Sequence, residues 1–222
     1  MQADNNQNNR VAIGLIEGLD PNSVISDIWK LVEEGLLDLF YNHKDVKPEK
    51  TLNFHLLNWL SVETYKRDRC VYRFLSEEPE NKQSGQSRSI DFSVRPKFDL
   101  SERFFAFEAK ILGLTVKNET EYLIGKKKQS GGIERIKKEL HVEDLNNAGM
   151  VGYMKTESFE FWFDDLNTSI KKLSKDKKDN WNDDDIIIKE KFEDNLAHLY
   201  SEHSRLLKPK IKLLHIWINL IQ

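Results

Sequence analysis

Cysteine is almost absent from this chain of 222 residues, and Cys70 is its only thiol. A single thiol excludes a disulfide framework and gives no support to secretion, because disulfide bonds persist in oxidising compartments. It also excludes a zinc site built from several cysteines. Since no neighbouring residue marks Cys70 as a nucleophile, we expect an inert, buried thiol.

Strong net charge and long apolar segments are missing as well. The formal net charge is -3, which excludes a strongly basic, histone-like protein but leaves local patches open. No apolar run approaches the ~20 residues of a membrane span. Residues 1–10 lack the basic-then-apolar order of a secretory signal. We therefore expect a cytoplasmic protein that does not enter a membrane, with residues 1–20 as a flexible polar lead.

The composition nevertheless supplies a core, since 39% of the residues are hydrophobic under a surface in which 32% are charged. Apolar periodicity predicts helices and strands in alternation. The expected helices are 22–41, 51–65, 131–140 and 159–173, and the expected strands are 70–75, 90–95, 104–112, 148–154, 185–192 and 212–221. Strands separated by helices predict a single α/β domain over residues 21–222, with a mixed central β-sheet flanked by helices on both faces.

One expected strand, "FFAFEAKIL" (104–112), contains two charged residues in an otherwise apolar run. Both of its faces are mostly apolar, which is typical of a central strand. Charged side chains such as Glu108 and Lys110 are rarely buried unless they are paired or bind a metal. Either this strand has a solvated face, or the two residues take part in chemistry.

The context of Glu108 distinguishes it from other acid-x-lysine sequences. Four such tripeptides occur in the chain, and only the one at Glu108 lies in an apolar strand. Asp91 precedes it by 108 − 91 = 17 residues on an alternating strand, a separation that fits two adjacent antiparallel strands joined by a turn. Such a pair would bring Asp91, Glu108 and Lys110 together.

The residue types at these three positions suit phosphoryl chemistry. Two carboxylates, from Asp91 and Glu108, are typical ligands of Mg²⁺ when waters and substrate phosphate complete the shell. Lys110 could orient a water or stabilise negative charge on the phosphate in the transition state. The sequence therefore predicts a metal-dependent catalytic site formed by these side chains.

At "SIDFSV" and "FEAK" the sequence resembles the PD-(D/E)XK nuclease superfamily, which has the restriction-endonuclease-like fold. The resemblance covers most of the chain as an order of elements, but only three residues as a motif. It implies a Mg²⁺-dependent endonuclease, with Mn²⁺ as a substitute ion, that hydrolyses phosphodiester bonds in DNA; RNA stays open as a substrate. Asp91 and Glu108 would hold the metal, and Lys110 would assist the attack.

The resemblance has one departure and one open position. Ile90 stands where the proline of the family motif would be. Family members often take a further metal ligand from the preceding helix, and Glu49 and Glu63 are both candidates. Proteins of this kind often act as homodimers, and bacterial examples commonly belong to restriction or phage-defence systems.

A basic segment follows the charged strand. In "KKKQSGGIERIKK" (126–138) six basic residues face a single acid. Lys126, Lys127, Lys128 and Arg135 are the candidates for contact with a nucleic-acid backbone. A solvated charged face is the alternative for this segment.

Three other interpretations stay open. The chain could be a catalytically inactive module with the nuclease fold that binds nucleic acid or a partner protein. It could be a plain interaction protein without a nucleic-acid role. At the level of residues, Asp91 could hydrogen-bond to the backbone at a strand end while Glu108 and Lys110 form an exposed surface pair.

Overall fold

The computed structural model describes residues 20–46, 48–67, 70–79, 89–97, 102–113, 119–125, 131–176 and 180–221. The strands in these ranges form one seven-stranded sheet in the order β1-β2-β3-β4-β7-β6-β5. Their bounds are β1 Tyr72–Pro79, β2 Ser89–Pro96, β3 Phe105–Leu112, β4 Asn147–Met154, β5 Ile188–Phe192, β6 Leu196–His203 and β7 Ile211–Asn219. The predicted mixed α/β sheet is confirmed, whereas the restriction-endonuclease-like fold stays a prediction.

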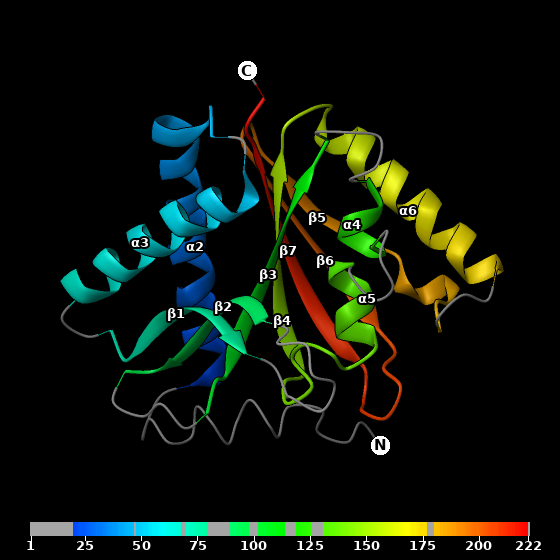
Figure 1. Ribbon diagram of the computed structural model, residues 1–222, viewed down its shortest axis with the longest axis horizontal. Helices are drawn as coiled ribbons and strands as arrows, with labels where there is room; N and C mark the ends of the chain where they lie inside the picture. Colours follow the sequence, from blue (N-terminus) through cyan, green and yellow to red (C-terminus); the bar gives the residue numbers. More distant parts are fainter. Residues whose placement is uncertain are drawn as a thin grey trace.

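Helices cover both faces of this sheet, as the sequence predicts. Helices α2 (Pro21–His43) and α3 (Glu49–Lys66) lie on one face. Helices α4 (Glu119–Leu123), α5 (Gly132–Lys137) and α6 (Phe159–Lys175) lie on the other (Figure 1). In the described part of the chain, no helix is both long and apolar enough to cross a membrane.

The centre of the sheet is parallel and its flanks are antiparallel. Strands β3, β4 and β7 run parallel to one another, while β1 and β2 on one side and β6 and β5 on the other pair antiparallel. Every residue of β3 is buried, because it has strands on both sides and helices over both faces. This burial explains why "FAFEAKIL" is mostly apolar on both faces. The predicted central strand is confirmed.

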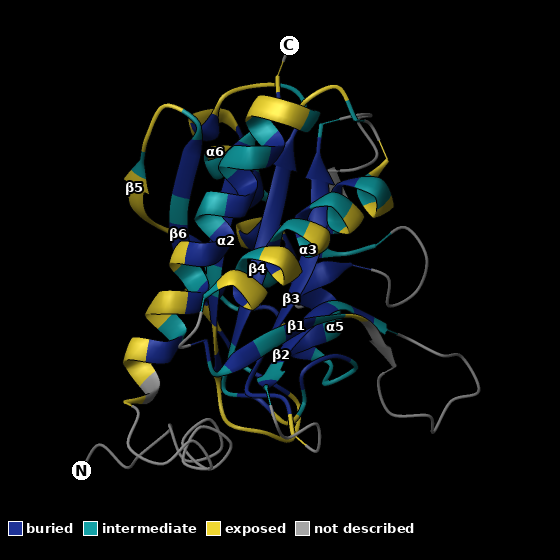
Figure 2. Ribbon diagram, turned by 90° about the vertical axis from the view of Figure 1, so that its left-hand side faces the viewer, coloured by how far each residue is buried: buried dark blue, intermediate teal, exposed yellow. Residues whose placement is uncertain are grey.

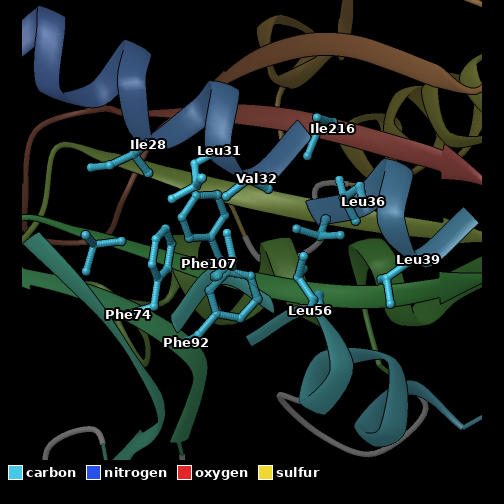
Figure 3. Close-up of a cluster of buried hydrophobic side chains, with 14 of the residues drawn as sticks. Ile28, Leu31, Val32, Leu36, Leu39, Leu56, Phe74, Phe92, Phe107 and Ile216 are labelled. Carbon is cyan, nitrogen blue, oxygen red and sulfur yellow. The ribbon is translucent and has the colours of Figure 1, made fainter. Parts of the chain in front are cut away.

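The core under α2 and α3 combines aliphatic side chains from both helices with aromatic and aliphatic side chains from the sheet. The Asp20 carboxylate accepts a hydrogen bond from the Ser23 amide and caps α2. The Phe107 ring stacks between Trp29 and Phe92. Figure 3 shows this cluster, which includes Ile28, Leu31, Val32, Leu36, Leu39, Leu56, Phe74, Phe92, Phe107 and Ile216. Figure 2 shows the buried strands behind helices whose outward sides are exposed.

Gly149→Ala should destabilise the protein by about 1–3 kcal/mol. Gly149 lies opposite Phe107 in the β3–β4 ladder, and an added Cβ would overlap the Phe107 ring. That ring is held in the aromatic stack and has little room to move. Urea unfolding measures the loss, with Gly35→Ala as the control. A methyl group at Gly35 would overlap less, because it would meet the flexible end of Leu56, Cδ1, at 2.8 Å and Trp59 Cε3 at 3.0 Å. Alanine is also the better helix former. Equal losses in the two variants would contradict the prediction.

Several elements differ from the sequence expectations. Helix α5 ends at Lys137 rather than at residue 140, and α4 was not predicted. Strand β6 was also missed, because its buried positions include Ser201 and His203, and such a strand lacks a strong apolar alternation. A 3-10 helix, η1 (Asp183–Asp185), was not predicted either. Cys70 is buried, as expected.

Candidate active site

The candidate site lies where β2 and β3 separate. Their ladder comprises three residue pairs and ends at Phe92 and Phe107. One residue further along β2, the Asp91 carboxylate accepts a hydrogen bond from the Ala109 amide at 2.8 Å. The Glu49 carboxylate of α3 accepts a hydrogen bond at 3.0 Å from the amide of Ile111, which lies two residues after Ala109 on β3. These two carboxylates thus accept hydrogen bonds from β3 amides that would otherwise donate to a neighbouring strand.

The ammonium group of Lys110 lies among these carboxylates. Its Nζ is 2.9 Å from Glu108 Oε1, 3.3 Å from Glu49 Oε1 and 3.7 Å from Asp91 Oδ2. The same Nζ donates to the Ala109 carbonyl at 2.6 Å. The structure therefore brings Asp91, Glu108 and Lys110 together, as the antiparallel pairing predicts, and adds Glu49 to them. We refer to these four residues as the carboxylate–lysine cluster.

Glu108 is the deepest member of the cluster, with a side chain that is 1% exposed. Arg135 Nη1 on α5 lies 3.2 Å from Glu108 Oε1, and His141 Nδ1 lies 3.1 Å from Glu108 Oε2. An exposed surface pair of Glu108 and Lys110 is therefore wrong, because both side chains are buried. The other half of that interpretation holds, since Asp91 does hydrogen-bond to the backbone.

The charges in the cluster are strongly coupled. Burial alone would raise the pKa of Glu108, but Lys110, His141 and Arg135 outweigh it and hold the pKa well below its usual value. Burial alone would lower the pKa of Lys110, but its three carboxylates raise it well above the usual range. Burial raises the pKa of Asp91 to about 7, against the opposing effect of Lys110. Glu108 and Lys110 therefore form a fully charged pair at neutral pH.

The structure separates the two candidates for a further acid. Glu49 touches both Lys110 and the β3 backbone. Glu63, near the other end of α3, instead pairs with Lys66 at 2.6 Å. Glu49 is therefore the acid that joins the cluster, and the sequence left this choice open because both residues lie in the same helix.

The basic candidates have different positions. Lys126, Lys127 and Lys128 lie outside the described residues. The guanidinium group of Arg135 forms an ion pair with the buried Glu108 carboxylate. Lys137 belongs to the same basic segment, and the alternative of a solvated charged face is wrong for it, because Lys137 is 2% exposed and pairs with Asp185.

The chemistry of the cluster can be compared with that of a divalent metal site. In the described ranges, no three His, Cys, Asp or Glu side chains are gathered as a ready-made metal-binding group. The carboxylates of Asp91, Glu49 and Glu108 surround the Lys110 ammonium instead. Among the described residues, the ammonium has four oxygen contacts, three from carboxylates and one from the Ala109 carbonyl. Such a donor set fits Mg²⁺ or Mn²⁺ in its chemistry.

A pocket opens beside the cluster, between α3 and the strands β1 and β2. Its volume is about 340 Å³. We call it the α3 pocket, and it is lined by Glu49, Lys50, Asn53, Phe54, Leu57, Asn58, Ser76 and Asp91. Glu49 and Asp91 therefore belong both to the cluster and to the pocket wall. A molecule in the α3 pocket would lie against these two carboxylates.

A second polar network, missed by sequence reasoning, lies behind α5. Lys137 Nζ donates to Asp185 Oδ2 at 2.8 Å, and His203 Nδ1 lies 3.1 Å from Asp185 Oδ1. His203 Nε2 is 2.7 Å from Ser201 Oγ. The order of acid, imidazole and hydroxyl resembles that of a hydrolase triad. Ser201 is fully buried, however, and its hydroxyl is held between two imidazoles, so the group cannot reach a substrate.

The network continues through Ser201 to His215 and has one consistent direction of hydrogen bonding. His215 Nε2 lies 2.7 Å from Ser201 Oγ, and His215 Nδ1 lies 2.7 Å from the Tyr122 hydroxyl. The Trp217 indole can only donate, and it donates to Tyr122 at 2.9 Å. The Asp185 carboxylate can only accept, so the neutral His203 ring donates to it through Nδ1 and accepts from Ser201 through Nε2. Ser201 then accepts from His215 Nε2, and His215 Nδ1 accepts from Tyr122. His215 is thus a hydrogen-bonded histidine of the core.

Acid should weaken the fold through these buried histidines. Burial lowers the pKa of His203 and His215, so the folded chain keeps both rings neutral where the unfolded chain protonates them. Their contribution to stability is present above about pH 6.5 and is lost as the pH falls, at up to ~1.4 kcal/mol per pH unit for each ring. Asp91, with its pKa raised to about 7, acts in the opposite sense. Urea unfolding of Asp91→Asn near pH 7.5 and near pH 5.5 isolates the histidines, and equal stabilities would contradict the prediction.

Comparison of the chain with models of protein families, with curated proteins and with solved structures finds no match.

Proposed function

We propose that the chain is a metal-dependent nuclease of the PD-(D/E)XK kind, which hydrolyses phosphodiester bonds in DNA. The observation that carries the proposal is the convergence of three carboxylates and a lysine where β2 leaves β3. The cluster lies next to a pocket with room for a substrate. A homodimeric assembly, a cytoplasmic location and a role in restriction or phage defence belong to the same proposal.

The cluster's residues have distinct roles in this proposal. Asp91 and Glu108 would hold Mg²⁺, with Glu49 and the Ala109 carbonyl as neighbouring oxygen donors. When bound, such an ion supplies positive charge that polarises a phosphoryl oxygen. Lys110 stays protonated, and its three N–H donors now face Glu108, Glu49 and the Ala109 carbonyl. It would exchange one of these contacts for a phosphate oxygen as negative charge grows in the transition state.

Two further residues support Glu108 without touching the substrate. Arg135 and His141 each contact one oxygen of this carboxylate. They fix its orientation and compensate its charge in a buried place, which is the role of the outer partners of a metal ligand. This supports an ionised, oriented Glu108 rather than a neutral one.

A second function is favoured by the ion pairs of Lys110. Because its ammonium contacts three carboxylates and a carbonyl oxygen, the cluster could serve only to join α3 to β2 and β3. The protein would then be an inactive module that binds nucleic acid or a partner protein. In that case metal ions would have no effect, and folded variants of Lys110 would behave like the wild type.

Cleavage of supercoiled and linear DNA in Mg²⁺ or Mn²⁺ tests the proposal. We expect metal-dependent cleavage, lost by about 10²–10³-fold or more in Asp91→Asn, since a group that holds or stabilises transition-state charge is removed. Glu49→Gln should also lower the rate. Glu63→Gln is the matched control on the same helix and should cleave like the wild type, because Glu63 pairs with the exposed Lys66 and lies outside the carboxylate–lysine cluster. Absence of cleavage by folded wild-type protein, or equal rates in Asp91→Asn, would contradict the proposal.

A further inference from the structure

The α3 pocket has a pattern of side chains that its position beside the cluster does not require. Lys50, Phe54 and Asn58 are spaced four residues apart, so they follow one another along a single face of α3. Phe54 is 59% exposed although it is a large aromatic residue. A cation, an open ring and an amide therefore follow one another along the same wall of the pocket.

Asn53 adds a positioned donor to this wall. The buried Tyr153 hydroxyl donates to Asn53 Oδ1 at 2.8 Å. Because the acceptor end of the amide is held in this way, its NH₂ group is the end that can serve a ligand in the pocket. Asn58 and Ser76 contribute an amide and a hydroxyl to the same lining. These groups suit the carbonyl and ring-nitrogen acceptors on the edge of a nucleobase.

The charges of the pocket do not suit the backbone of a duplex. Among the described residues that line it, Lys50 is the one cation, against the carboxylates of Glu49 and Asp91. Duplex binding depends on several cations that neutralise a series of phosphates. The volume of about 340 Å³ lies at the lower end of the range for small-ligand pockets, which leaves room for one nucleoside rather than a base pair.

We propose that the α3 pocket binds one unpaired nucleotide, so that the substrate is single-stranded DNA, with the base stacked on Phe54 and its edge facing Asn53. The inference rests on the proposed nuclease function and narrows its substrate class. A base in a duplex would have to leave its stack to enter the pocket, which costs free energy that a single strand does not need. The phosphate next to the bound nucleotide would then lie toward Asp91 and Glu49.

Binding, measured separately from cleavage, tests this proposal. Fluorescence anisotropy is recorded on ice in Mg²⁺, before appreciable cleavage, with a labelled single-stranded oligodeoxynucleotide and with the same sequence as a blunt duplex. A 2-aminopurine base in the single strand reports stacking through quenching of its fluorescence. We expect the single strand to bind more tightly than the duplex. Phe54→Ala should weaken single-strand binding by about 5- to 150-fold and remove the quenching.

Tyr65→Ala is the matched control, because Tyr65 is an aromatic residue on the same helix that is 83% exposed and does not line the pocket. It should bind like the wild type, and both variants remove exposed rings, so both should fold. Equal loss in the two variants, an unchanged affinity in Phe54→Ala, or preference for the duplex would overturn the proposal. If cleavage fails while Phe54-dependent binding persists, the nuclease function falls and the pocket stands. If duplex DNA is cleaved without dependence on Phe54, the nuclease function stands and the assignment of the α3 pocket to an unpaired nucleotide falls.

Discussion

Lys110→Met should slow cleavage strongly and at the same time increase the stabilisation of the protein by divalent cations. The loss of a positioned cation at the reacting phosphate is expected to lower the rate by about 10²–10³-fold. The same substitution leaves the carboxylates of Glu108, Asp91 and Glu49 facing one another without the ammonium that now lies among them. Without metal the variant should therefore be destabilised by about 3–5 kcal/mol, as when one partner of a buried ion pair is removed.

Thermal unfolding in EDTA and in Mg²⁺ or Mn²⁺ separates these effects. A bound ion stabilises the folded state by RT ln(1 + [L]/Kd), and the ion no longer competes with an ammonium group in the variant. The rise in Tm on adding metal should thus be larger for Lys110→Met than for the wild type. Lys66→Met removes a lysine that is 62% exposed, and it should match the wild type in both assays. A Lys110→Met protein that cleaves normally, or that gains nothing from metal, would contradict the metal-site interpretation.

The sequence was most informative where one local pattern had one structural cause. "FAFEAKIL" is mostly apolar on both faces because β3 has neighbouring strands and helices on every side. Because such a strand is buried, its charged residues Glu108 and Lys110 stood out as candidates for a functional site. The separation of Asp91 from Glu108 predicted the antiparallel pair β2–β3, which the structure confirms. Glu49 could not be chosen over Glu63 in advance, since the choice depends on how α3 lies against the splayed strands.

The buried network behind α5 could not be predicted from local patterns. Asp185 is one of three consecutive aspartates, and only its surroundings make it buried while Asp183 and Asp184 are exposed. Its partners Lys137 and His203 come from distant parts of the chain, 48 and 18 residues away. Charged residues in polar sequence are usually solvated. This general tendency therefore predicts a solvated Lys137, whereas the structure buries it.

Asp185→Ala should cost about 3–5 kcal/mol of folding stability, although it lies in a run that resembles a surface loop. The substitution leaves the Lys137 ammonium buried without its carboxylate and removes the acceptor of His203 Nδ1 and of the Asn182 amide. Asp184→Ala is the matched control, because its side chain is exposed and the change should stay within ±0.5 kcal/mol. Urea unfolding of both variants measures the difference.

The same substitution connects the buried network to the candidate site. Lys137 and Arg135 lie on one short helix, α5, and Arg135 contacts Glu108. If the Lys137–Asp185 pair fixes α5, then Asp185→Ala should also lower cleavage at temperatures where the variant is still folded, because the orientation of Glu108 is no longer held. The double variant Lys137→Met/Asp185→Leu removes both charges, and it should recover much of the stability, since apolar side chains often replace a buried ion pair without loss. If the double variant is no more stable than Asp185→Ala, the unpaired lysine charge is not the source of the loss. The hydrogen bonds to His203 and Asn182 would then account for it.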